Sequence, residues 1–221
     1  MSVLVEAAVE TIGGAVRAAR DGARRLELCA DLPRGGTTPG PGLLRAVRAR
    51  VDLPLHVMIR PRAGEFSFDA AECGAMIWDI AEARRAGAEG VVIGALTPQG
   101  LVDREWTARL VNAARPLEVT FHRAVDATPE IAAAVETLVQ LGVDRVLTSG
   151  GAATAEQGLE VLASLAGEFG GRIGILPGGQ IRGGNVARIV RAMKVSEVHV
   201  GFPAGSEPER VAGVVAALDG R

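Results

Sequence analysis

The chain has 221 residues, of which 48% are hydrophobic, so it can bury a large core within one domain. It carries 24 basic and 26 acidic residues, a formal net charge of −2, and both signs are scattered along the sequence. This distribution offers neither the basic stripe that binds a nucleic-acid backbone nor the polybasic patch that binds an anionic membrane. We therefore expect one domain over residues 1–221, and no nucleic acid or membrane as a partner.

Eight short apolar runs along the chain have the length and composition of β-strands. Amphipathic stretches rich in Ala and Arg separate them and predict seven helices. The expected strands are Val3–Ala7, Arg25–Cys29, Leu55–Arg60, Gly90–Gly94, Leu117–His122, Arg145–Ser149, Arg172–Leu176 and Glu197–Gly201. The expected helices are Val9–Asp21, Gly42–Arg50, Ala70–Ala86, Glu105–Ala114, Glu130–Leu141, Ala155–Glu168 and Gly183–Met193.

Start and stop signals agree with this alternation. Thr128-Pro129-Glu130 has the pattern of a helix N-cap followed by a proline at the first helical position, and Gly22, Gly87 and Gly142 each end a helix shortly before a strand. Regular alternation of strands and helices indicates parallel strands. Because no GxGxxG turn follows the first strand, eight such units favour a closed (β/α)8 barrel of the TIM type over an open doubly wound sheet.

Polar residues occur on one consistent side of the predicted strands. Glu27 and Cys29 alternate with the two leucines of their strand, and successive side chains of a strand point to opposite faces. Parallel strands that are buried on both faces are usually apolar throughout. The polar side therefore predicts a hydrophilic barrel lumen. The other residues on this side are His56, Met58, Arg60, Thr120, His122, Glu197 and His199.

Six charged or imidazole side chains fall at or near strand ends that a barrel gathers around its C-terminal mouth. They are Glu6, Glu27, Arg60, His122, Arg123 and His199. Carboxylates beside cations in a partly desolvated cavity have shifted pKa values and can form acid–base pairs. Glu27, His122 and His199 are the candidate catalytic residues. The alternative is a structural ion-pair network, and Glu197, at the start of its strand, is interpreted as structural.

Arg60 and Arg62 flank a proline after the third strand, which directs one guanidinium group inward and the other outward. Forked guanidinium groups suit a carboxylate or a phosphate. An Arg60 paired with Glu27 on the neighbouring strand is an equally good interpretation. Both arginines are candidate ligand-binding residues.

Two turns are further candidates for binding an anion. Gly178 and Gly179 follow the seventh strand, where many barrels bind phosphate through backbone amides, although a plain tight turn is the alternative. Ser149 ends the sixth strand and could donate a hydrogen bond to a ligand. No GxSxG motif surrounds Ser149, so a nucleophilic role is not expected and a turn is favoured.

Metal binding would depend on Cys29. It shares its face with Met58 and His56 on the next strand, and a thiolate, a thioether and an imidazole together suit Cu(I). The alternative is that Cys29 packs as a small hydrophobic residue, as we expect for Cys73. Neither cysteine belongs to a CxxC pair or has zinc spacing, so a disulfide framework and structural zinc are not expected.

Other sequence features exclude certain chemistries and suggest a location. The one lysine, Lys194, precedes the eighth strand at the wrong end of a barrel for a Schiff base, and the chain contains no tyrosine acid. A strand-like run begins within two residues of Met1, so no signal peptide is predicted. No window has ~18 uninterrupted apolar residues, so no membrane span is predicted. We expect a cytoplasmic protein.

Six motifs together resemble the CutC family of copper homeostasis proteins, over a stretch from Val5 to His199. They are Glu27-Leu28-Cys29, Gly35-Gly36-Thr37-Thr38-Pro39, Met58-Ile59-Arg60-Pro61-Arg62, Thr120-Phe121-His122-Arg123-Ala124, Leu147-Thr148-Ser149-Gly150 and Glu197-Val198-His199. The resemblance implies a TIM-type barrel, a cytoplasmic location, a homodimer and a role in copper handling. Family members often have a cysteine where this chain has Ala8 and a Cys or Ser where it has Val200, so a copper site of paired thiolates cannot form here within one subunit.

The sequence therefore predicts a CutC-like protein, nominally of copper homeostasis and copper binding, whose barrel mouth binds a small anionic molecule. The expected ligand-binding residues are Glu6, Arg60, Arg62, Arg123, Ser149, Gly178 and Gly179, and the expected metal ligand is Cys29, for copper. The alternative function is a TIM-barrel isomerase or lyase that acts on a small phosphorylated or carboxylated metabolite.

Overall fold

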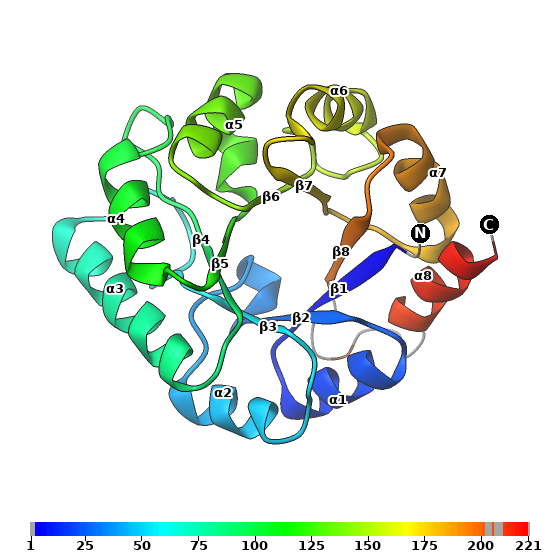
Figure 1. The fold of residues 1–221 in the computed structure, drawn as a ribbon, viewed down its shortest axis with the longest axis horizontal. Helices are drawn as coiled ribbons and strands as arrows, with labels where there is room; N and C mark the ends of the chain where they lie inside the picture. The colour runs from blue at the N-terminus through cyan, green and yellow to red at the C-terminus, as the bar shows by residue number, and fades with distance from the viewer. Residues whose placement is uncertain (1–2, 202–204, 206–209, 221) are drawn as a thin grey trace.

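A computed structural model describes residues 3–201, 205 and 210–220, and within them eight parallel strands form a ring (Figure 1). The sheet order is β7-β6-β5-β4-β3-β2-β1-β8, so β1 to β7 pair in sequence order and β8 pairs with β1. β7 and β8 are the two ends of this sheet, and they lie in contact where the ring closes. The strands are β1 Leu4–Val9, β2 Arg25–Leu28, β3 Leu55–Met58, β4 Gly90–Ile93, β5 Glu118–Phe121, β6 Arg145–Thr148, β7 Gly174–Pro177 and β8 Glu197–Gly201. The predicted (β/α)8 barrel is confirmed.

The helices form an outer layer around this ring (Figure 1). They are α1 Ile12–Arg20, α2 Pro41–Arg48, α3 Ala70–Arg85, α4 Arg104–Ala114, α5 Ile131–Gln140, α6 Leu159–Phe169, α7 Gly183–Met193 and α8 Arg210–Asp219, with two 3-10 turns, η1 Leu32–Arg34 and η2 Arg123–Ala127. The seven predicted helices are present, and α8 is an eighth that the sequence analysis missed. Its buried residues Val211, Val214 and Leu218 have helical spacing. No helix of the described residues is long and apolar enough to cross a membrane.

The structure corrects the predicted starts of three helices, and the largest difference is in α6, which begins at Leu159 and not at Ala155. β1 runs two residues further than expected, so α1 begins at Ile12, and the Thr11 side chain accepts a hydrogen bond from the Gly14 amide. The predicted N-cap at Thr128 is wrong, because its hydroxyl donates to the Val125 carbonyl and ends η2, and α5 begins later, at Ile131. Short polar residues bind nearby carbonyls as readily as they cap helices, so a sequence pattern cannot choose between the two.

The two faces of the sheet are chemically different, as the strand alternation predicted. Leu26 and Leu28 belong to the apolar core between strands and helices, whereas Glu27 and Cys29 do not. Cys29 packs instead in a small second cluster with Met58 and Val92. The lumen therefore holds charged groups along its length and a few apolar side chains on one wall.

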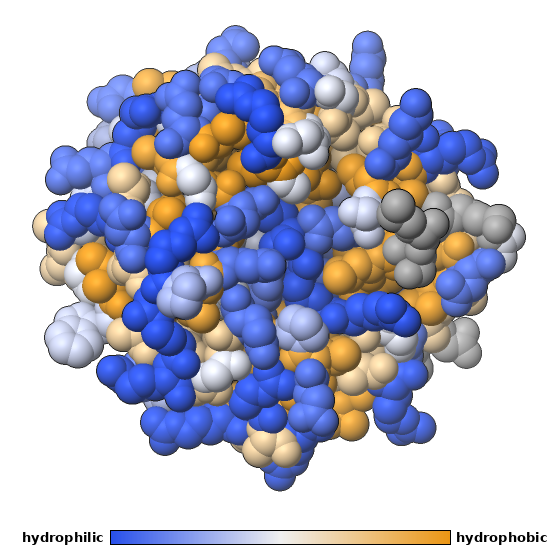
Figure 2. Space-filling model, viewed as in Figure 1, coloured by the Kyte–Doolittle hydropathy of each residue, from blue (hydrophilic) through white to orange (hydrophobic). Residues whose placement is uncertain are grey.

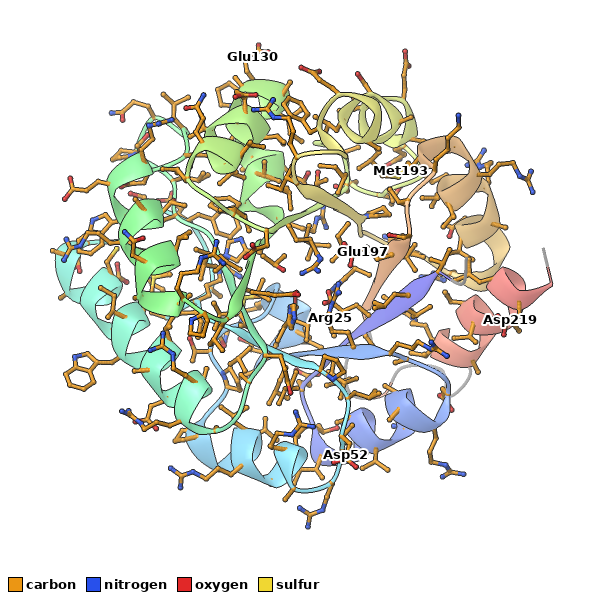
Figure 3. The ribbon with its side chains drawn as sticks, viewed as in Figure 1. Arg25, Asp52, Glu130, Met193, Glu197 and Asp219 are labelled. Carbon is orange, nitrogen blue, oxygen red and sulfur yellow. The ribbon has the colours of Figure 1, made fainter. Side chains whose placement is uncertain are left out.

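Charged side chains fill the lumen at the end where the strands begin. Glu197 of β8 accepts a hydrogen bond from Arg25 at 2.8 Å and another from Arg145 at 2.7 Å, and Arg145 also contacts Glu118 at 3.2 Å. Figure 3 shows Arg25 and Glu197 inside the ring, and hydrophilic residues gather over its centre in Figure 2. Every one of these four groups has a partner of opposite charge. We call Arg25, Glu118, Arg145 and Glu197 the lower network.

Candidate functional site

A cavity of about 410 Å³ opens at the C-terminal ends of the strands. Active sites of (β/α)8 barrels lie at this end. Residues within or just after seven of the strands, all except β4, contribute to its wall. The lining residues are Ala8, Glu27, Leu32, Arg34, Gly35, Met58, Arg60, Phe66, His122, Arg123, Leu147, Gly179, Gln180, His199 and Gly201. We call this space the mouth cavity.

Arg60, which follows β3, is a buried cation on the wall of the mouth cavity, and only 4% of the residue is exposed. Its guanidinium group donates to the carbonyl of Gly36 at 3.0 Å and to that of Gly64 at 2.7 Å, and it lies 4.7 Å from the centre of the Phe66 ring. Its Nε has no hydrogen-bond partner among the described residues, and no described carboxylate forms an ion pair with it. The alternative pairing with Glu27 is therefore not observed.

His122, which follows β5, presents a neutral imidazole to the same cavity. Its Nδ1 accepts a hydrogen bond from the Ala124 amide at 3.1 Å, so Nε2 carries the proton of the neutral ring. Burial, assisted by the positive charge of Arg60, lowers the pKa of His122 to about 3. Nε2 has no partner among the residues described and is therefore an unused hydrogen-bond donor.

Gly94, just after β4, makes room for this imidazole. A Cβ atom built at Gly94 would lie 2.2 Å from Cε1 of His122, far inside van der Waals contact. The same arrangement occurs lower in the barrel, where a Cβ at Gly90 would lie 2.6 Å from Nε2 of His56. The absence of a side chain at these two positions therefore leaves room for the rings of His122 and His56.

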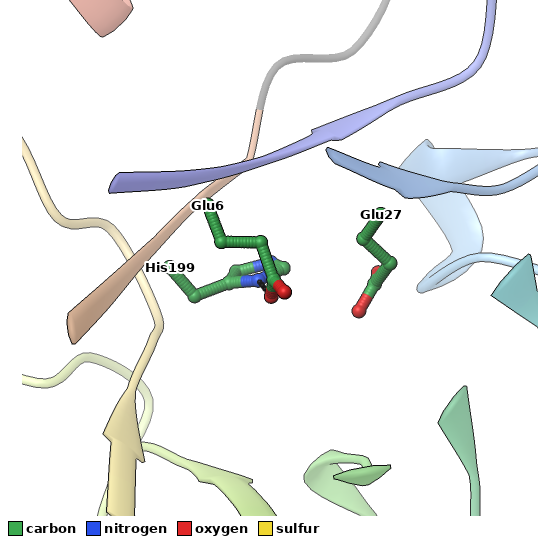
Figure 4. A group of neighbouring side chains, drawn as sticks. All are labelled: Glu6, Glu27 and His199. Carbon is green, nitrogen blue, oxygen red and sulfur yellow. Dashed lines mark hydrogen bonds and ion pairs between the residues drawn. The ribbon is translucent and has the colours of Figure 1, made fainter. Parts of the chain in front are cut away.

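Glu6, Glu27 and His199 form a buried cluster on the floor of the mouth cavity, projecting into one space from β1, β2 and β8 (Figure 4). The parallel register places Glu6 opposite both Arg25 and His199. His199 Nδ1 lies 2.7 Å from Oε1 of Glu6, and Arg25 donates to the other oxygen of that carboxylate. Glu27 accepts a hydrogen bond from the Cys29 thiol at 3.2 Å, while its Oε2 has no partner among described residues.

The pKa values of the two carboxylates of this cluster are shifted in opposite directions. Burial raises the pKa of Glu6, but Arg25 and the His199 ring outweigh it and hold this pKa well below its usual value. Burial also raises the pKa of Glu27, and here nearby positive charge is insufficient to reverse the effect. The pKa of His199 is raised, because the attraction of Glu27 and the hydrogen bond to Glu6 together outweigh burial.

Arg123 reaches the cavity wall from η2, where Asp126 and Ser149 hold it. Its Nε donates to Asp126 at 2.8 Å and its Nη2 to the Ser149 hydroxyl at 2.6 Å. Asp126 also accepts hydrogen bonds from the amides of Ser149 and Gly151. The sequence analysis missed Asp126, whose only signal was its position three residues after Arg123. Ser149 itself serves this turn and does not line the mouth cavity.

The Gly-Gly turn after β7 contributes one of its two glycines to the cavity. Gly179 lines the wall with φ +98, and Gln180 beside it has φ +56, so two successive residues adopt the left-handed conformation. Gly178 lies behind, with its amide bonded to the Thr148 carbonyl at 2.9 Å. Gln180 is a wall residue that the sequence analysis did not select.

The three proposed copper ligands do not come together. Cys29 and Met58 pack in one cluster, but His56 lies lower, with its ring nitrogens 4.0 Å from Glu6 and 3.6 Å from Glu118. The donors left for Cu(I) are one thiol and one thioether. Burial and the adjacent Glu27 raise the pKa of the Cys29 thiol well above its usual value, which opposes formation of the thiolate that binds metals. This set fits Cu(I) poorly.

Two other predicted positions lie away from the cavity. Arg62 is on the outer surface, where it forms an ion pair with Glu72 and lies 5.1 Å from the centre of the Phe68 ring. Lys194 ends α7 at the opposite end of the barrel, as the sequence indicated. Of the predicted site residues, those that line the mouth cavity are Glu27, Arg60, His122, Arg123, Gly179 and His199, with Glu6 beneath them.

Comparison with known proteins gives matches over most of the chain. The model of the CutC family matches residues 3–204. A CutC family protein of Xanthomonas campestris pv. campestris is 45% identical over 195 residues, covering 88% of this chain and 81% of that protein. The copper homeostasis protein cutC homolog of Mus musculus is 45% identical over 196 residues, covering 89% and 72%. The crystal structure of CutC from Streptococcus agalactiae has a TM-score of 0.86 at 29% identity, covering 91% of this chain and 99% of that one.

Proposed function

This chain belongs to the CutC family, and from that premise we propose that the mouth of its barrel binds a small organic anion through Arg60. This proposal rests on one observation, which is that the Arg60 side chain is buried without an acidic partner among the described residues. A guanidinium group that is 4% exposed lines a cavity, has an unpartnered Nε and faces no described carboxylate. A buried charge normally has a partner of opposite sign, so a carboxylate or phosphate of the ligand would supply it.

Two neighbours of Arg60 favour the same kind of ligand. The free Nε2–H of His122 can donate a hydrogen bond without adding a second positive charge. Arg123 lines the same cavity and can also offer positive charge, since 41% of its side chain is exposed. An anion of the size of a small metabolite fits a volume of about 410 Å³.

We further propose that the protein catalyses an isomerase or lyase reaction on this anion. Side chains on the floor and wall of the cavity support this. Glu27 faces the cavity with a carboxylate oxygen that has no partner among described residues, and it could move a proton on the ligand. His122 would then polarise a ligand oxygen by donating from Nε2. Arg60 and Arg123 would hold the anionic group.

A thermal-shift screen with a panel of carboxylated and phosphorylated metabolites tests the proposal. We expect at least one to raise the melting temperature of the wild-type protein, and Arg60→Met to abolish that shift. Arg62→Met is the matched control, because Arg62 lies outside the cavity, and it should respond like the wild type. Arg60→Lys, which keeps the charge but loses the fork, should retain a weaker shift. The proposal fails if no compound shifts the wild type, or if Arg60→Met responds equally.

Binding of Cu(I) as cargo is a second candidate. The observation in its favour is that the Cys29 thiol and the Met58 thioether pack together beside the cavity, since soft sulfur donors suit Cu(I). Cys29→Ser should remove Cu(I) binding in a competition titration, whereas Cys73→Ser, which alters a buried thiol in α3, should not. Unchanged stoichiometry in Cys29→Ser would reject this candidate.

The homodimer and the cytoplasmic location remain predictions. Trp78 on α3 has the largest exposed fraction, 71%, of the large hydrophobic residues described, so we propose that the dimer interface includes it. Light scattering on the wild type and on Trp78→Glu would test this. A dimer that dissociates in the variant would support the interface, and a monomeric wild type would reject the dimer.

A further inference from the structure

We propose that Glu6, Glu27 and His199 together bind a first-row divalent cation, of the class of Mn²⁺ or Zn²⁺, on the floor of the mouth cavity. Each residue offers one donor atom, and the three atoms lie within 4.8 Å of one another. All three side chains project into the same space from adjacent strands (Figure 4). The site is distinct from the sulfur pair of Cys29 and Met58 and from the anion-binding arginine.

The donors have the chemistry that such ions prefer. Two carboxylates and one imidazole suit Mn²⁺, Fe²⁺ or Zn²⁺, whereas Cu(I) prefers thiolates and thioethers. Ligand atoms at ~2.0–2.2 Å from one ion lie roughly 3–3.5 Å apart. Since the three atoms are at most 4.8 Å apart, side-chain shifts of about an ångström or less would close them around a cation.

The unsatisfied oxygen of Glu27 points to a ligand independently of this clustering. Glu27 is 2% exposed, and its Oε2 has no hydrogen-bond partner among the described residues, although its other oxygen accepts from Cys29. A buried carboxylate oxygen without a partner is costly, and native proteins rarely leave one unsatisfied. A cation beside Glu6 and His199 would satisfy it.

The distribution of charge in the lumen also favours a cation at the cluster of Glu6, Glu27 and His199. Arg25 contacts both Glu6 and Glu197, and Arg145 contacts Glu197 and Glu118. Glu27, by contrast, forms no ion pair with any described arginine or lysine. A divalent cation would neutralise Glu27 and leave a positive centre next to the cavity.

Small residues next to the cluster leave space for further ligands of the cation. Ala8 and Gly201 lie opposite each other on β1 and β8 and line the cavity close above Glu6 and His199. Three protein ligands with open positions are typical of catalytic rather than structural metal sites. A cation on Glu27 would exclude this carboxylate as the proton carrier of the isomerase or lyase. The cation site does not depend on anion binding, because the metal alone is the probe.

Calorimetric titration of tag-free, chelator-treated protein with Mn²⁺ and with Zn²⁺ tests the site. We expect one equivalent to bind to the wild type, and Glu27→Gln and His199→Gln each to weaken binding about 100-fold. Cys29→Ser is the matched control, because Cys29 touches Glu27 but is not a proposed ligand, and it should bind Mn²⁺ like the wild type. The site is rejected if the wild type binds neither ion, or if Glu27→Gln and His199→Gln both bind like the wild type.

A second measurement needs only the wild-type protein and therefore does not depend on the variants folding. Pulsed electron paramagnetic resonance of the Mn²⁺ complex should show modulation from one imidazole nitrogen, since His199 is the one nitrogen ligand proposed. Bound Mn²⁺ without such modulation would contradict the assignment. Zn²⁺ binding that Cys29→Ser abolishes would also contradict it. A thermal shift by anions that persists in chelator-treated protein would leave anion binding intact, so the two proposals fail separately.

Discussion

The two ends of the barrel lumen hold similar types of residue, but they differ in whether the polar groups have partners. In the lower network, each carboxylate contacts at least one arginine, and Glu197 contacts two. At the mouth, Arg60, Glu27 and His122 each have a buried polar atom without a partner among the described residues. His56 at the lower end is the exception, because its Nδ1 has no hydrogen bond and lies 4.0 Å from Glu6.

We interpret the lower network as structural, and we propose that the unpartnered groups at the mouth bind a ligand. In the lower network the charged groups pair with one another, so they have no unpaired charge that a ligand could neutralise. Polar atoms that stay unsatisfied beside a cavity cost folding free energy, and such sites are typical of ligand binding. The following predictions test whether the two ends behave in these two ways.

The largest effect is expected at the lower end. Arg25→Met removes the guanidinium group between Glu6 and Glu197, and it should lower the free energy of unfolding by about 3–5 kcal/mol, because the buried carboxylate of Glu6 loses its arginine partner and Glu197 keeps only Arg145. Urea denaturation measures this change. Arg172→Met, which breaks an exposed ion pair with Glu136, is the control and should cost less than about 1 kcal/mol. Equal losses in both variants would contradict the account.

Gly90 at the start of β4 and Gly94 just after its end allow the same substitution to be compared at the two ends of the lumen. Gly90→Ala and Gly94→Ala each push a methyl group into a histidine ring, so each should cost about 1–3 kcal/mol in urea denaturation. Only Gly94→Ala should also reduce the anion-induced thermal shift, because it displaces His122. Gly74→Ala in α3 is the control, since a Cβ there meets nothing within 4 Å. An unchanged anion shift in Gly94→Ala would show that His122 takes no part in binding.

The buried histidines predict a loss of stability in mild acid. The pKa is about 3 for His122 and about 4 for His56, below the ordinary value of 6.5. The unfolded chain therefore binds more protons between these values, and stability falls with decreasing pH by up to about 1.4 kcal/mol per unit for each histidine. Unfolding free energies measured between about pH 4 and 6.5 should show a shallower slope in His56→Gln. A slope equal to that of the wild type would contradict this.

The smallest effect is expected outside the barrel. Arg62→Ala removes an exposed ion pair with Glu72 and should change the unfolding free energy by less than about 1 kcal/mol. The anion-induced thermal shift should also be unchanged. A lost shift would mean that Arg62 binds the ligand, as the sequence alone suggested.

The sequence could predict which side chains face the lumen. It could not predict at which level along the barrel axis side chains of different strands meet. Alternation along the strands correctly assigned Glu27, Cys29 and His56 to the lumen. The level of a residue along the barrel axis depends on the register between strands. This register pairs Glu27 with His56, and Cys29 and Met58 lie two residues further along their strands, closer to the mouth. For this reason the copper trio looked plausible in the sequence and is absent from the structure. Asp126 escaped prediction because its partners, Arg123 and Ser149, meet only after two loops fold together.

We propose above all that Arg60 and His122 bind an anion in the mouth cavity. A crystal structure of the protein with the metabolite that gives the largest thermal shift tests it most directly. We expect a carboxylate or phosphate within hydrogen-bond distance of Arg60 Nε and His122 Nε2. An anion bound to Arg25 and Arg145 at the lower end, with none in the mouth cavity, would contradict it.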